Sequence, residues 1–208
     1  MKIWRIAFAI GMLCALLGAS SPVAADGPRV ASADLESLVL TAEDLGPGWV
    51  QMGAQRERPG PLGEVFAMSY HHDGDPAPRS LQITLMTSAV PSEVVLEGVR
   101  LSASLNGAVF IPGPAIGDGA SYQGMLPAFV GPATVMYLYR VGTVVVMVLW
   151  LADSWISGNG PPDTSELAPI LEAEALGIAL LQADRIRISP PPPVDPPVLP
   201  TTPVMRVR

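Results

Sequence analysis

The sequence is poor in the residues on which most covalent stabilisation and much enzyme chemistry depend. Its 208 residues include one cysteine, one lysine and two histidines, and only 6% are aromatic. A single cysteine cannot form an internal disulfide, so a folded domain must be held by its hydrophobic core. A net charge of −7 and a pI near 4.7 leave no basic surface for phosphate, which excludes a nucleic-acid binder. What is abundant is apolar: 49% of the residues are hydrophobic, too many for a wholly disordered chain.

Residues 1–25 have the pattern of a secretory signal peptide. Lys2 lies in a positive start, residues 6–17 form an apolar run, and small residues precede a predicted cleavage after Ala25. The run is shorter than the ~20 residues of a spanning helix, so an uncleaved anchor is the less favoured alternative. No lipobox surrounds Cys14, which disfavours a lipoprotein. Cleavage would remove the only lysine and the only cysteine, which excludes thiol and Schiff-base chemistry in the mature protein. We expect that mature protein to be secreted or extracytoplasmic and to have no membrane span.

The other end is a low-complexity segment. Residues 189–208 contain eight prolines and no glycine. Such a run favours extended polyproline II and cannot build a packed core. We expect a disordered Pro-rich tail, with a PxxP-type ligand as the alternative.

Residues 26–188 are long enough for one domain with its own core. Alternation and helical periodicity predict an α+β fold, an antiparallel sheet with helices packed on one face. The expected helices are 34–45, one opening at 91–93 and ending at 106–107, and one from Asp163 to about 188; the expected strands are 65–70, 80–88, 120–123, 134–140 and 143–151.

Local signals within these elements give sharper expectations. Thr41 and Asp44 have the spacing of a capping box, and Trp49 is expected to plug the core. Pro169 should lie in the first turn of the last helix, and residues 141–142 should turn the last hairpin. The apolar stripe of the middle helix is read as Val94, Val95, Gly98, Val99, Leu101, Ser102 and Leu105, and that of the last helix as Leu167, Ile170, Leu171, Ala175, Ile178 and Leu181.

Few side chains are candidates for chemistry. His71, His72, Asp73 and Asp75 are the only cluster of metal-ligand types, but adjacent histidines on a strand point to opposite sides. We interpret the cluster as a polar turn, with a weak metal site as the alternative. Glu43 with Asp44, and Glu172 with Glu174, are expected on solvated helix faces.

The segment around Ser121 fits neither a nucleophile elbow nor a dinucleotide-binding loop, because its glycines lie at the wrong distances. We expect a tight turn in which Asp118 bonds nearby backbone N–H groups. A Ser121 hydrolase would need His71 or His72 as its base. Arg140 is expected at a solvent-exposed turn, or else paired with Asp118 or another acid. No catalytic, cofactor or metal residue is assigned.

Three phrases resemble a group of secreted bacterial proteins. Residues 40–49 resemble a Leu-x-x-x-Asp-Leu-Pro-x-Gly-Trp phrase, with Gly46 in place of the proline. Residues 116–120 resemble a Gly-Asp-x-Ala turn, and residues 139–146 resemble an Arg-x-Gly-x-Val-Val hairpin. Similar α+β domains include PsbP-like and extracytoplasmic sensor-like domains, and the resemblance carries no catalytic residue.

These observations predict an exported, non-enzymatic binding or sensor-like domain. Its ligand would be hydrophobic, or its partner a protein, bound on an apolar sheet face or on the loop 111–131. A small secreted serine hydrolase and a structural cell-envelope protein are the alternatives.

Overall fold

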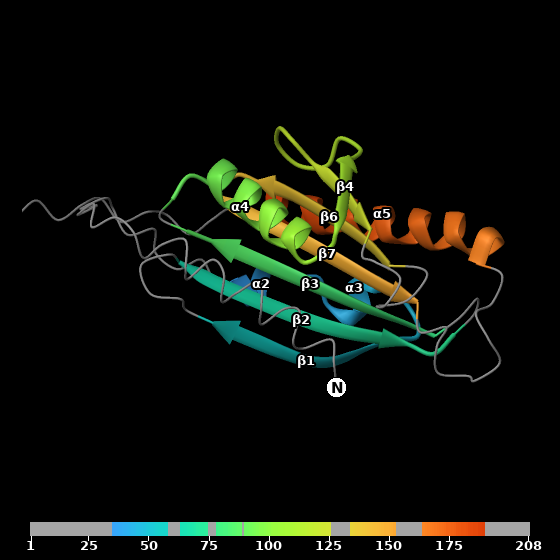
Figure 1. Cartoon of the computed structure of the whole chain (residues 1–208). Coiled ribbons are helices and arrows are strands. Elements are labelled where there is room, and N and C mark those ends of the chain that lie inside the picture. Colours follow the sequence, from blue (N-terminus) through green and yellow to red (C-terminus); the bar gives the residue numbers. More distant parts are fainter. Residues whose placement is uncertain are drawn as a thin grey trace, which may run out of the picture.

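Seven strands form one antiparallel sheet in the computed structural model, in the order β1-β2-β3-β7-β6-β5-β4 (Figure 1). The structure describes residues 35–57, 63–74, 78–88, 90–125, 134–152 and 164–189, so the predicted signal peptide and Pro-rich tail lie outside the described residues. The strands are β1 (Trp49–Glu57), β2 (Glu64–His72), β3 (Arg79–Thr87), β4 (Val109–Pro112), β5 (Tyr122–Met125), β6 (Thr134–Val141) and β7 (Val144–Ala152), and the helices are α2 (Leu35–Leu38), α3 (Ala42–Leu45), α4 (Ser92–Leu105) and α5 (Thr164–Ile188). This arrangement confirms the predicted α+β class.

Both faces of the sheet are covered, which explains the continuous apolar run of β7. Its alternate side chains Val146, Val148 and Trp150 pack in one core cluster, while Met147 and Leu149 pack in another. A strand buried on both faces has no polar side and therefore reads as unbroken hydrophobic sequence. The last hairpin is confirmed, although it turns at Gly142 and Thr143, one residue later than predicted.

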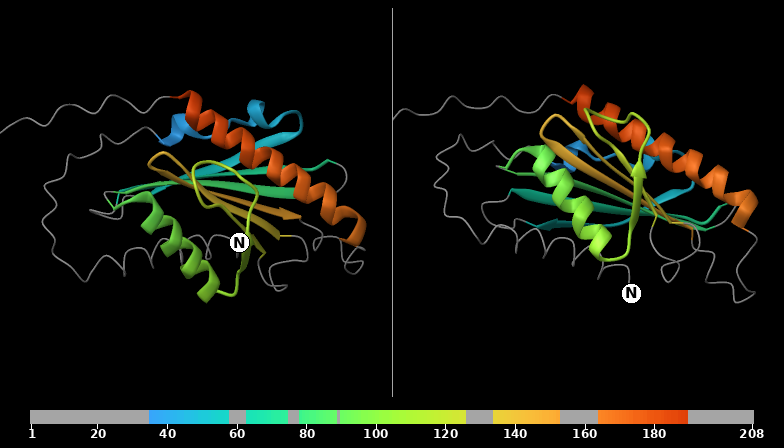
Figure 2. Two further views of the ribbon diagram at one scale, coloured as in Figure 1. Left: turned by 90° about the horizontal axis from the view of Figure 1, so that it is seen from above. Right: turned by 45° about the horizontal axis from the view of Figure 1, so that its top comes forward.

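The helices divide between the two faces. We call the face that carries Val146, Val148 and Trp150 the first face, and the opposite one the second face. α5 packs on the first face with α2 and α3, because Ala175, Ile178 and Ala179 lie in the same cluster as Leu35 and Leu38. α4 packs on the second face against β6 and β7, which differs from the prediction that all helices share one face (Figure 2). The first face is already covered by α5 with α2, so α4 buries its apolar side on the face that α5 leaves open.

The middle helix also turns a different stripe toward the sheet. Its buried residues are Leu96, Val99, Ser102 and Ala103, whereas Val94, Leu101 and Leu105 are exposed. The predicted stripe was therefore right at Val99 and Ser102 and wrong at the three exposed positions. Two apolar stripes run along this helix, and periodicity alone does not say which one meets the core.

Other local signals have mixed outcomes. Thr41 caps α3 and forms the predicted capping box with Asp44, and Trp49 is buried as expected. The first predicted helix divides into α2 and α3 at residues 39–41. Pro169 lies beyond the first turn of α5, contrary to the prediction. Ile170 and Leu181 are exposed, so the predicted stripe of this helix is wrong at these two positions. The predicted cap Asp163 lies outside the described residues.

Two strands were not predicted. β1 has few strand-forming residues and is held by its pairing with β2, with a bulge between Gln51 and Gly53. β4 forms the opposite edge of the sheet by pairing with β5, which begins two residues later than expected. These two edges determine which backbone groups the sheet offers to partners.

Candidate functional site

A row of exposed apolar side chains lies at the β4 edge of the sheet. Val109, Ile111 and Met125 are 65%, 55% and 61% exposed, respectively. Val109 and Met125 are directly opposed in the β4–β5 ladder, and Ile111 follows Val109 at the strand period of two, so all three share the first face. We call these three residues the β4 row. Adjacent exposed side chains of this size mark an interaction surface more strongly than scattered ones.

A second exposed stripe lies on α4, directly before β4 in the chain. Val94, Leu101 and Leu105 are exposed, Leu105 most of all at 74%. Asn106 closes the helix with a side-chain bond to the Ser102 carbonyl at 2.9 Å, and β4 begins three residues later. The end of α4 and the start of β4 therefore bring exposed apolar residues close along the chain.

A polar cluster fixes α4 to β5 on the second face of the sheet, opposite the face that carries the β4 row. The Tyr122 hydroxyl donates to the Glu97 carboxylate, and Arg100 Nε donates to the same carboxylate at 2.8 Å. The Arg100 guanidinium lies 5.2 Å from the Tyr122 ring centroid, and Phe110 meets that ring edge-on at 6.4 Å. The hydrogen bond from Tyr122, helped by Arg100, lowers the pKa of Glu97, and the same bond raises the pKa of Tyr122. Tyr122 of β5 is thereby fixed to α4, and Phe110 of β4 packs against the ring of Tyr122.

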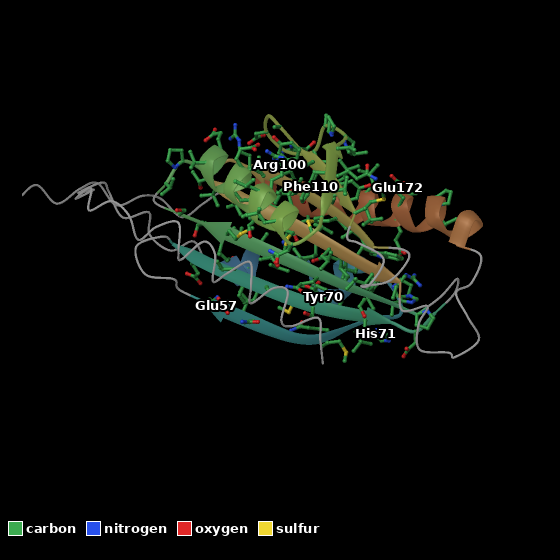
Figure 3. All side chains as sticks on the ribbon, viewed as in Figure 1. Glu57, Tyr70, His71, Arg100, Phe110 and Glu172 are labelled. Carbon is green, nitrogen blue, oxygen red and sulfur yellow. The ribbon has the colours of Figure 1, made fainter. Side chains whose placement is uncertain are left out.

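An acidic residue, Glu172 of α5, lies on the same face of the sheet as the β4 row. Gln123, opposite Ile111 in the ladder, donates its side-chain amide to Glu172 on α5. In the view of Figure 3, Arg100, Phe110 and Glu172 lie along the upper side, where β4 is drawn, and His71 lies on the lower side, at the end of β2. A ligand on the β4 row would therefore meet apolar side chains and a carboxylate.

Comparison with protein-family models, curated proteins and solved structures gave no match. Within the part of the chain that the structure describes, no helix is long and apolar enough to cross a membrane.

The serine site considered as an alternative is not assembled. The Ser121 hydroxyl donates to the Pro114 carbonyl, just before β5 begins. His71 and His72 lie on β2, and β3, β7 and β6 separate that strand from β5. Neighbouring strands are about 4.8 Å apart, so neither histidine reaches Ser121. Asp118 was expected to bond backbone N–H groups of its own turn, but it accepts the Gly142 N–H at 2.7 Å and caps the β6–β7 turn.

The two histidines end strand β2 rather than lying in the turn, and they point to opposite faces as expected. His72 Nδ1 accepts the Gly74 N–H at 2.8 Å, and its ring packs edge-on against Trp49. His71 Nε2 lies 2.8 Å from Asp73 Oδ1. Among the described residues, no group of three or more His, Cys, Asp or Glu side chains is arranged to hold a metal ion; Asp75 lies outside them.

Sequence reasoning missed a hydrogen-bonded chain of Ser80, His71 and Asp73. Ser80 Oγ lies 3.3 Å from His71 Nδ1, because the two residues are directly opposed in the β2–β3 ladder. A catalytic triad also needs backbone donors for an oxyanion. β3 is an interior strand paired on both sides, so its ladder bonds occupy the N–H groups around Ser80. We interpret this chain as a cross-strand contact that orders the hairpin.

The remaining candidates are structural. Arg140 lies in β6 and pairs with Glu93 of α4 at 3.0 Å, so the expected exposed turn is wrong and the alternative, pairing with an acid, is confirmed. Glu174 pairs with Arg79 at 2.9 Å, and the Arg79 side chain is only 8% exposed. One of the expected solvated carboxylates is therefore the partner of a buried arginine.

Proposed function

We propose that the chain is an exported, non-enzymatic binding domain that takes a hydrophobic ligand or a protein partner at the β4 row. The observation that carries the proposal is the exposure of Val109, Ile111 and Met125 as one row on the edge of the sheet. Burial of such side chains contributes roughly 25 cal/mol per Å² of apolar surface, so a partner that covers the row gains affinity without any change in the fold.

The chemistry of the described residues favours binding over catalysis. Ser121 has no histidine within reach, and Ser80 lies on an interior strand without oxyanion donors. The proposal of export depends on the signal-like residues 1–25, and the sensor-like reading on the resemblance in residues 40–49, 116–120 and 139–146.

Site-specific photocrosslinking tests the proposal. A benzophenone amino acid at Ile111 of the exported chain is irradiated with the extracytoplasmic fraction of the organism that encodes it. We expect discrete adducts from this position and none from a matched probe at Leu180 on α5, which is 43% exposed. The Val109→Lys substitution should remove the adducts, because it places a charge in the apolar row.

Equal labelling from Ile111 and Leu180, or adducts that persist with Val109→Lys, would contradict the proposal. Circular dichroism of each variant shows whether the fold is retained. Hydrolysis of ester substrates that is lost on Ser80→Ala would favour the serine hydrolase instead.

A further inference from the structure

We propose that the partner at the β4 row is an extended peptide segment that adds to the sheet as an eighth strand beside β4 and carries a basic side chain toward Glu172. This inference rests on the proposed function and names the class of its partner. Strand addition uses backbone hydrogen bonds for affinity and alternate side chains for specificity. Both are available at this edge.

The backbone register shows which groups β4 offers. Gly113 N–H donates to the Ser121 carbonyl at 2.9 Å, which makes this a hydrogen-bonded pair of the β4–β5 ladder. Hydrogen-bonded and non-bonded pairs alternate, so the N–H and C=O of Phe110 and the C=O of Pro112 point away from β5. β4 is the last strand in the sheet order, and these groups therefore face outward. Pro112 lacks an N–H, which limits the added strand to a register centred on Phe110.

The side chains of the edge suit a strand partner. Proteins protect sheet edges with charged side chains, bulges and prolines. β4 has neither a charge nor a bulge among its four residues, and proline occurs only at its last position. The other edge, β1, is interrupted by a bulge at Gln51 and Gly53 and ends on the charged residues Arg56 and Glu57. The contrast selects β4 as the edge open to pairing.

Charge complementarity defines the peptide further. Alternate side chains of an added strand would lie on the first face beside Val109 and Ile111, the side on which Gln123 reaches Glu172. The chain carries a net charge of −7, so a basic peptide is also favoured at long range. We infer a segment with apolar side chains two residues apart and a Lys or Arg next to them.

The test uses random linear peptides displayed on phage and selected on the immobilised full chain. The most enriched peptide is synthesised, and its Kd is measured by fluorescence anisotropy. We expect alternating apolar residues with a Lys or Arg in the enriched sequences. Ile111→Lys should weaken binding by about tenfold or more, and the matched Met52→Lys change on β1, at a side chain 67% exposed, by no more than about twofold. Glu172→Gln should weaken binding about threefold at low salt and less at high salt.

Methylation of single backbone nitrogens along the peptide gives a readout that needs no protein variant. In strand addition only alternate N–H groups face β4, so methylation should abolish binding at every second residue and spare the residues between. Binding that is insensitive to methylation but lost with Ile111→Lys overturns strand addition and leaves the proposed function standing. Failure to enrich any peptide, or binding unaffected by Ile111→Lys, overturns strand addition. A dimer in sedimentation that Ile111→Lys dissociates assigns the edge to a second copy of the chain and also overturns the inference.

Discussion

The side chain of Gln182 on α5 accepts a hydrogen bond from the backbone N–H of Leu40 at 3.0 Å. Its amide nitrogen also donates to the Leu38 carbonyl at 2.8 Å, and Gln182 has no exposed surface. The Tyr70 hydroxyl, which comes from β2 on the same face of the sheet, donates to the Leu40 carbonyl. One glutamine thus satisfies the irregular backbone between α2 and α3 and fixes it to the longest helix.

Gln182→Leu should therefore destabilise the fold far more than its volume suggests. The substitution leaves the Leu40 N–H and the Leu38 carbonyl buried without partners, and each such group costs about 1–3 kcal/mol. Urea denaturation measures the loss. Leu181→Ala, at the neighbouring exposed position, is the control and should change the free energy of unfolding by less than about 0.5 kcal/mol. Equal effects of the two substitutions would contradict this role of Gln182.

Two glycines should respond to alanine with opposite signs. Gly117 has a φ of +72°, and a Cβ there would lie 2.1 Å from the Arg140 carbonyl oxygen, so Gly117→Ala forces the loop away from β6. Gly98 lies within α4 with open space at its Cβ position, so Gly98→Ala should stabilise the protein by about 0.5–1 kcal/mol. Thermal unfolding checks both, and a destabilising Gly98→Ala would show that this helix position is occupied in solution.

The predictable part of the fold is the part set by local chemistry. The capping box of Thr41 and Asp44 formed as predicted because its two bonds lie within four residues. The β6–β7 hairpin was also predictable, since its flanking strands are rich in Val and Tyr and its turn contains Gly142. β1 was not, because its residues have little strand preference and pair only where β2 provides a template.

The candidate site was predicted only in outline. An apolar sheet face or the loop 111–131 was expected to bind, and the β4 row lies partly in that range. Val94, Leu101 and Leu105 repeat at helical spacing, as the buried Leu96, Val99 and Ala103 also do. Periodicity detects an apolar stripe but not its partner, and the side of the sheet on which a helix packs is decided by tertiary structure. Exposed apolar residues therefore look like core residues in a single sequence.

The exported chain should begin at Asp26. Mass spectrometry of the protein recovered from the culture medium or periplasm of a bacterial host measures the mature N-terminus. Ala25→Pro should block cleavage, because proline does not fit the small-residue cleavage pattern, and the precursor should accumulate. Ser37→Ala, at an exposed position of α2 away from the cleavage site, is the control and should leave cleavage unchanged. An intact N-terminus on the exported wild-type chain would favour the retained anchor.

All four tyrosines should ionise abnormally late, and this should make the fold sensitive to alkali. Burial raises the pKa of Tyr137 to about 12 and also raises the pKa values of Tyr70 and Tyr139, and the bond to Glu97 raises that of Tyr122. Unfolded tyrosines ionise near pH 10, so above that pH the unfolded state binds fewer protons than the native state. Stability should be complete below pH 10 and fall as the pH rises toward 12.

Tyrosinate ultraviolet absorbance distinguishes the two states. The native protein should show little tyrosinate at pH 10, whereas the protein in urea should be about half ionised there. Tyr137→Phe removes one late-ionising group and should reduce the alkaline loss of unfolding free energy relative to wild type, since the remaining three tyrosines alone contribute to it. Native absorbance that titrates near pH 10 for all four groups would show that Tyr137 and Tyr139 are accessible to solvent, and the packing of α5 over the sheet would then need revision.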